Sequence, residues 1–375
     1  MRSTLPPSSA TTSASDSALD FGTHAGLLGG FEHGRSCNFS FTRVDSLLPK
    51  INITKQSLRR IEAVQLVREQ RHERRQELAF HARPFVLCGL PLRRLPSDKL
   101  LYTRRNGKFF LQVLGHPQFG LPYGQDRLIP IWVATIAVRQ RSRIVHFGAA
   151  SEILDFFRLF KDGKRYRRLM EGFQRVFGAT MFFGTNNEPD RELVLDWARF
   201  HFFDHLHLWF HKTEAAPTAS SNHENCAVLS QAFYQEIDQH RIPVEREVVA
   251  ALANAPGVLD LYLWLVWKTW SLNNHTARIP LFAAGGLANQ LGSGGYSADR
   301  FFRRKLARWL TEVKAFWPHC PAQISLDGQT LIVHSSQKNP AIPAMPIGSR
   351  ARASRPDEVQ SMLQVDRETV VHSRD

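Results

Sequence analysis

Apolar and basic residues separate onto two sides of the segment from Ser297 to Trp317. The apolar positions recur near helical spacing, and they are Phe301, Phe302, Leu306, Trp309, Leu310, Val313, Phe316 and Trp317. The opposite side carries Arg300, Arg303, Arg304, Thr311 and Lys314. This periodicity predicts an amphipathic helix with one face packed inward and one basic face.

The neighbours of this helix follow a recognisable order. The preceding stretch IPLFAAGGLANQLGSGGYS has the pattern of a strand, a short helix and a glycine-rich turn, and SLDGQTLIVH predicts a hairpin around Asp327-Gly328. Strand, helix, helix and hairpin in this sequence are typical of a winged helix-turn-helix, in which the basic helix enters the DNA major groove.

A second segment, GKRYRRLMEGFQRVF, repeats the pattern, with Lys164, Arg165, Arg168 and Arg175 off its apolar face. A core helix from Leu128, the strand RIVHFG and a helix capped by Ser151 precede it, and FVLCGLP and KLLYTRRNGKFFLQVLG predict strands further upstream. Asn106-Gly107 is a strong hairpin signal within the latter. The chain therefore contains two similar modules.

We predict an α+β fold of two tandem winged-helix (helix-turn-helix) domains with disordered N- and C-terminal tails. The low-complexity tails are residues 1–45 and 338–375, because their composition cannot bury enough apolar surface to order the chain. The first domain is 46–212 and the second is 226–337, and they are joined by a polar linker at 213–225.

Net charge, cysteine spacing and the length of apolar runs limit the partners and the compartment expected for this chain. The 375 residues carry a formal net charge of +14, and such an excess favours polyanions, above all nucleic acid. The four cysteines, Cys37, Cys88, Cys226 and Cys320, form no CxxC pair and suit a reducing cytoplasm. No signal peptide is expected, and VLDLYLWLVW is too short and too charged, at Asp260, to span a membrane. We expect a cytoplasmic protein that does not contact membranes.

A metal-dependent nickase is the main enzymatic alternative. His205 and His207 lie on one face of a predicted strand and could hold a divalent ion, and Tyr234 follows as a candidate nucleophile. However, Asp238 stands where such nucleases often carry lysine, and the other histidines nearby favour a strand that is merely rich in histidine. GxxxxGK[ST], GxSxG and HExxH motifs are absent from the sequence. We expect no enzymatic activity, no cofactor and no bound metal.

Three segments resemble a known family: LPYGQDRLIPIW, RYRRLMEGFQRVFG and FFRRKLARWL. Within a similarity that spans about residues 80 to 335, they resemble the plasmid-encoded RepA replication initiators of Gram-negative bacteria. The resemblance implies two winged-helix domains, the first for dimerisation and partner contacts and the second for reading DNA. The contacts that it implies by position are Arg300, Arg303, Arg304 and Arg308 in the second domain, and Lys164, Arg165, Arg167, Arg168 and Arg175 in the first.

The function implied by this resemblance is initiation of plasmid replication. Such an initiator binds repeated sequences in the double-stranded DNA of the plasmid origin, promotes opening of the duplex and recruits host proteins such as the host initiator and the replicative helicase. A homodimer is compatible with it, and initiators often repress their own gene. A transcriptional repressor on the same scaffold remains an alternative, as does the nickase that would use His205, His207 and Tyr234.

Overall fold

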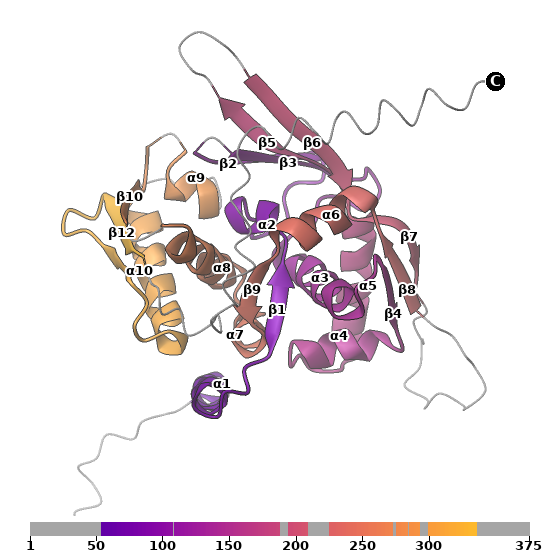
Figure 1. Ribbon diagram of the computed structural model, residues 1–375, viewed down its shortest axis with the longest axis horizontal. Helices are drawn as coiled ribbons and strands as arrows, with labels where there is room; N and C mark the ends of the chain where they lie inside the picture. Colours follow the sequence, from indigo (N-terminus) through magenta and orange to yellow (C-terminus); the bar gives the residue numbers. More distant parts are fainter. Residues whose placement is uncertain are drawn as a thin grey trace, which may run out of the picture. The chain divides into compact units, whose positions relative to one another are not determined.

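The computed structural model describes residues 54–107, 109–187, 194–208, 225–272, 275–283, 285–292 and 299–335 (Figure 1). The predicted tails, 1–45 and 338–375, lie outside these ranges, as does the predicted linker up to its last residue, Asn225. Both helices and strands are present, so the predicted α+β class is confirmed. The helices in chain order are α1 (Lys55–His72), α2 (Arg83–Leu87), a 3-10 turn η2 (Gly124–Arg127), α3 (Leu128–Gln140), α4 (Ala150–Phe156), α5 (Gly163–Phe177), α6 (Gln231–His240), α7 (Arg246–Leu252), α8 (Pro256–Ser271), α9 (Leu287–Leu291) and α10 (Asp299–Phe316).

The strands form four antiparallel sheets in the described part of the chain. One sheet has the order β2 (Leu101–Asn106), β3 (Phe109–Leu114), β5 (Thr180–Asn187) and β6 (Val194–His201). Its first turn is the predicted hairpin: Gly107 has a φ of +56° and Asn106 pairs with Phe109. A positive φ favours glycine, which explains why the Asn-Gly signal marked this turn.

Two other sheets share one plan. The first contains β4 (Ile144–Phe147), β8 (Asn225–Leu229) and β7 (Phe203–His207), and the second contains β10 (Thr276–Pro280), β12 (Thr330–His334) and β11 (Ala322–Ile324). In each, the first strand pairs with the last, which also pairs with the middle one. The chain order also repeats, because α3, β4, α4, α5, β7 and β8 correspond to α8, β10, α9, α10, β11 and β12. The strands β5 and β6 are inserted between α5 and β7.

The fourth sheet pairs distant segments. Strand β1 (Leu78–His81) runs antiparallel to β9 (Ile242–Glu245). Arg71 of α1 pairs with Glu245 at 2.8 Å from Nη2 to Oε1, and its Nη1 donates to the carbonyl of Phe316 at the end of α10. The segments predicted as the first and second domains therefore exchange strand and side-chain contacts, and the predicted boundaries themselves stay a prediction.

Two local predictions were wrong. The run FVLCGLP, predicted as a strand, begins within α2, because Pro84 in the first helical turn has no N–H to give to a sheet and is preset for a helix start. Helix α4 starts after Ala149 and is not capped by Ser151. The carboxylate of Glu152, in the first turn, instead reaches back and accepts from the backbone N–H groups of Gly148 and Ala149 at 2.9 and 3.1 Å, just before the helix.

The apolar helix α8 is buried along nearly its whole length. Its one carboxylate, Asp260, lies in the core and pairs with the guanidinium of Arg127, which is equally buried. No helix in the described ranges is long and apolar enough to cross a bilayer. The inward face of α10 packs on α8, where Gly257 leaves room for the ring of Trp309: a Cβ on Gly257 would lie 2.1 Å from the Trp309 Cζ2 atom.

Candidate nucleic-acid interface

The basic face of α10 is exposed, as its periodicity predicts. The buried residues of the helix are Phe302, Leu306, Trp309, Leu310, Val313 and Phe316. Arg300 and Arg304 lie on the exposed side, and neither forms an ion pair with another described residue. The ring of Phe301, which is 40% exposed, lies 5.1 Å from the Arg300 guanidinium carbon and 5.8 Å from that of Arg304. These two guanidinium groups are therefore partly oriented by an aromatic ring and face solvent.

Arg303 has a different environment from its neighbours. It is half-buried, and its Nε donates to the carbonyl oxygen of Gly328 in the β11–β12 hairpin at 2.7 Å. Its guanidinium also lies 5.5 Å from the ring of Phe282. A Cβ on Gly328, whose φ is +65°, would lie 2.7 Å from Arg303 Nε. Arg303 thus joins α10 to the hairpin, a contact that helical periodicity does not reveal.

The hairpin tip is fixed by its own polar groups. Asp327 accepts from the Ser325 hydroxyl and, at 3.0 Å, from the backbone N–H of Gln329. The Ser325 hydrogen bond, followed by the Gln329 N–H, lowers the pKa of Asp327, which therefore carries a negative charge at neutral pH. Leu326 beside it is fully exposed.

Arg308 is exposed on α10, with a side chain that is 72% accessible. Its nearest acidic partner is Glu312, at 3.9 Å from Nε to Oε1, and Glu312 also lies 3.8 Å from Arg60 of α1. Exposed pairs at this distance contribute little, so Arg308 is free to exchange Glu312 for another anion.

The basic residues of α5 differ in burial. Lys164, Arg167 and Arg168 are exposed, while Arg165 is half-buried and pairs with Asp162 at 3.3 Å. Arg175, by contrast, is buried: its Nε and Nη2 donate to the carboxylate of Asp126 at 2.7 and 3.1 Å. Arg175 is therefore not part of the candidate contact surface. If it turned away to bind DNA, the carboxylate of Asp126 would remain buried without its counter-ion.

Lys164, Arg165 and Arg168, near the start of α5, border a groove of about 690 Å³. Arg93 and Arg94 join them from the loop before β2, and Asn254 and Pro256 come from the turn that leads into α8. Sequence reasoning missed Arg93 and Arg94. The available signal was an Arg-Arg pair in the short segment PLRRLP, which lies outside any regular element.

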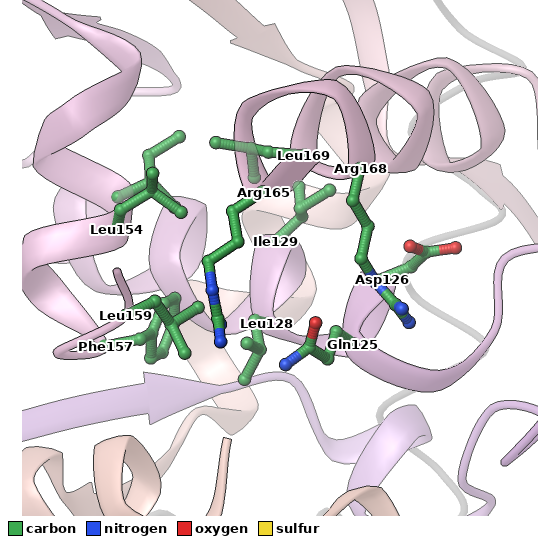
Figure 2. Close-up of a pocket in the computed structure, with 11 residues that line it drawn as sticks. Gln125, Asp126, Leu128, Ile129, Leu154, Phe157, Leu159, Arg165, Arg168 and Leu169 are labelled. Carbon is green, nitrogen blue, oxygen red and sulfur yellow. The ribbon is translucent and has the colours of Figure 1, made fainter. Parts of the chain in front are cut away.

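A small apolar cavity of about 40 Å³ lies beside these residues, between α5 and α4 (Figure 2). Leu154, Phe157 and Leu159 line one side, and Arg165 and Arg168 extend along it from α5. Arg165 and Arg168 therefore border both the cavity and the groove. Their aliphatic stems cover apolar surface, and the Arg168 guanidinium forms no ion pair with another described residue, whereas that of Arg165 pairs with Asp162.

The predicted nickase residues are spread over two elements. His205 and His207 are exposed on β7, and Tyr234 is half-buried in α6, packed against the core. His201 bonds to Asp204 at 2.9 Å. Within the described ranges, His, Cys, Asp and Glu side chains form no group of three that could hold a metal ion.

Comparison with known proteins identifies one family segment. Residues 168–280 match the family model described as plasmid encoded RepA protein. The predicted resemblance to RepA is confirmed. The RepA match begins inside α5 at Arg168 and ends with β10 at Pro280, so α10 and the Arg93-Arg94 loop lie beyond it.

Two solved structures also resemble the chain. One is a crystal structure of RctB domains 2–3, with 13% identity and a TM-score of 0.41 over 65% of this chain and 92% of that one. The other, a selenomethionine derivative of domains 2 and 3 of RctB, has the same identity and TM-score over 59% of this chain and 81% of that one. No curated protein matches the sequence.

Proposed function

We propose that this chain is a plasmid replication initiator that binds double-stranded DNA at repeated sequences of the origin. The observation that carries the proposal is the exposed pair Arg300 and Arg304 on α10, next to a hairpin fixed to the same helix by Arg303. The RepA match and the net charge of +14 support the same conclusion.

In this proposal both repeated modules are winged helices. The order α8, β10, α9, α10, β11, β12 and the strand pairing β10-β12-β11 support it, because they put the basic helix directly before a hairpin. Helix α10 would lie in the major groove, where arginine can bond guanine through two hydrogen bonds. The corresponding helix α5 would contact the DNA backbone or a partner through Lys164, Arg167 and Arg168.

In this proposal the protein acts through the free energy of DNA binding and catalyses no reaction itself. Occupation of repeated sites would bend the DNA and weaken a neighbouring AT-rich duplex, and the helicase and polymerase of the host would supply the chemistry. A homodimer and repression of its own gene are compatible with this role. A magnesium- or manganese-dependent nick in supercoiled origin DNA that disappears in Tyr234→Phe would contradict the absence of catalysis.

The DNA-reading face can be tested with the double variant Arg300→Ala/Arg304→Ala. Because each good bidentate contact to a base contributes about 1–3 kcal/mol of discrimination, we expect the preference for origin repeats over random duplex to fall at least tenfold. Arg68→Ala/Arg105→Ala is a matched control, since it removes the same charge from exposed positions on α1 and β2. An unchanged preference in the α10 variant would remove the basis for this assignment.

Initiator and repressor are separated by replication itself. If the protein is supplied in trans to a plasmid that carries only the matching origin, an initiator allows the plasmid to replicate. A repressor of the same fold lowers transcription and leaves that plasmid unable to replicate. A footprint of regularly spaced direct repeats supports the initiator, whereas a single inverted repeat supports the repressor.

A further inference from the structure

We infer that the groove at the start of α5 is a second site for DNA, which holds the phosphates of a duplex backbone. This inference rests on the proposed function; it assigns the start of α5 to the DNA backbone and not to a protein partner, and it adds Arg93 and Arg94 to the contact surface. The five cations at the groove are Arg93, Arg94, Lys164, Arg165 and Arg168. They come from two separate segments of the chain, so they form a charged surface only in the folded protein.

The charge of the groove is not neutralised from within. Asp162 is the one acid among the described residues that line it, and its carboxylate already accepts from the Arg165 backbone N–H at 2.8 Å and pairs with the Arg165 guanidinium. No described residue forms an ion pair with Arg93, Arg94, Lys164 or Arg168. Four cations that share a concave surface repel one another, and an anion in the groove relieves that repulsion.

Hydrogen bonds from the buried Arg127 hold two backbone segments of the groove in place. Nη2 of the buried Arg127 donates to the carbonyls of Leu90 and Pro91 at 3.0 Å each, and its Nε donates to the Gly124 carbonyl at 2.7 Å. The backbone N–H of Gly124 bonds in turn to the Pro91 carbonyl at 2.9 Å. The loop that carries Arg93 and Arg94 is thereby tied to the turn before α3, so little ordering remains to oppose binding.

The segment before α8 is hydrogen-bonded to the same turn, and Arg168 of α5 lies close to it. Gln125 Nε2 donates to the Asn254 side-chain oxygen at 2.8 Å, which attaches the segment before α8. Gly124, with a φ of +58°, lets Arg168 come close, since a Cβ there would lie 3.1 Å from Arg168 Nη2. A strand of DNA in the groove would contact segments from both halves of the chain.

The size of the site favours a backbone over a single phosphate. One phosphate occupies two or three donors, whereas this groove of about 690 Å³ offers five cationic side chains, four of them exposed. One strand of duplex DNA presents a charge every ~3.4 Å along the helix axis, so successive phosphates can meet successive side chains. Phosphates carry no base information, so this site adds affinity for any sequence.

The test uses the full chain and a short duplex of random sequence, with affinity measured over a series of salt concentrations. Because each neutralised phosphate contributes about 0.9 to the log–log salt slope, Arg93→Ala/Arg94→Ala should reduce the slope by roughly 1.8 and the affinity about 60-fold near ~0.1 M salt. Arg68→Ala/Arg105→Ala removes equal charge elsewhere and should leave the slope within about half a unit of the wild type. Equal losses of salt slope and affinity in the two variants would refute the inference that the groove binds DNA.

A second duplex, with the origin repeats, keeps the two proposals apart. Arg93→Ala/Arg94→Ala should lower the affinity for both duplexes by the same factor. Arg300→Ala/Arg304→Ala should lower the ratio of the affinity for the origin repeats to that for the random duplex. If Arg93→Ala/Arg94→Ala behaves like the control and Arg300→Ala/Arg304→Ala still loses its preference for the origin repeats, the groove is not a DNA site and the proposed function stands. If the wild type has no preference but the groove variant still lowers the salt slope, the groove stands and the reading of repeats fails. Unchanged circular dichroism and thermal midpoints identify variants that remain folded.

Discussion

The buried pair between Arg127 and Asp260 gives the sharpest stability prediction. Both side chains are almost fully buried, at 3% and 5% exposure, and the pair connects the residue that precedes α3 to the second turn of α8. Asp260→Ala leaves the Arg127 guanidinium charged and without a counter-ion in the core. Removal of one partner from a buried pair costs about 3–5 kcal/mol, a large part of the roughly 5–15 kcal/mol that stabilises a typical domain.

The conservative variant separates charge from hydrogen bonding. Asp260→Asn keeps an acceptor for Arg127 but not the negative charge, so we expect a smaller loss of about 2 kcal/mol. Arg127→Met should cost more than either, because it also leaves the carbonyls of Leu90, Pro91 and Gly124 without their donor. Adding Asp260→Leu to Arg127→Met should then recover stability, with a coupling energy of about 2–3 kcal/mol.

Urea unfolding followed by circular dichroism and by tryptophan fluorescence measures these changes, since Trp132 and Trp264 are both buried in the core. The matched control is Asp238→Ala, which removes an exposed acid that pairs with Arg241 at 3.4 Å. Its expected cost is under about 1 kcal/mol. A loss of less than about 1 kcal/mol for Asp260→Ala, or additive effects in the double variant, would refute the reasoning.

Three further predictions concern the core and the hairpin. Gly257→Ala should destabilise the protein by at least about 1–3 kcal/mol in urea unfolding, because its Cβ would overlap Trp309, and equal stability would show that α8 and α10 pack differently. Gly328→Ala should cost about 1–2 kcal/mol and weaken origin binding in a titration, through a strained positive φ and the displaced Arg303, whereas Gln329→Ala at the same tip should do neither. Burial, and secondly Arg127, lowers the pKa of His81 to about 3, so the fold keeps this imidazole neutral while the unfolded chain protonates below its ordinary pKa of 6.5. Stability should therefore fall as the pH drops from 6.5 toward 3, by about 1.4 kcal/mol per unit from this group, and His81→Phe should remove that part of the slope in denaturation curves.

The elements that could be predicted are those whose signals are local. The amphipathic period of α10 predicted its buried face except at Phe301, which is 40% exposed. On α5 the period was less accurate, because Met170 and Phe177 on its apolar side are exposed. Asn106-Gly107 marked its hairpin through a positive φ that few other residue pairs accept. The strand predicted over FVLCGLP was wrong, because the spacing of apolar residues in so short a run does not distinguish a strand from a helix. Pro84, in the first turn of α2, favours the helix.

The site depended more on distant partners. Arg175 and Arg303 have the periodicity of exposed cations, but Asp126 and the Gly328 carbonyl, each far away in sequence, hold them in place. Arg93 and Arg94 belong to no regular element and gain their role only when Arg127 ties their loop to the turn before α3. Helical spacing assigns a side chain to a face, but it contains no information about what the rest of the chain brings to that face.

The pairing of β1 with β9 has a consequence for biosynthesis. The register joins Leu78 to Glu245 and His81 to Ile242, so the backbone of β1 has no β9 partner until the ribosome has released the chain beyond residue 245. Pairing between such distant segments slows folding, and an unpaired strand edge invites association with other chains. A nascent chain therefore carries β1 without its partner strand while residues 82 to 245 are synthesised, and a translational pause upstream of Ile242 would lengthen the period in which aggregation competes with folding.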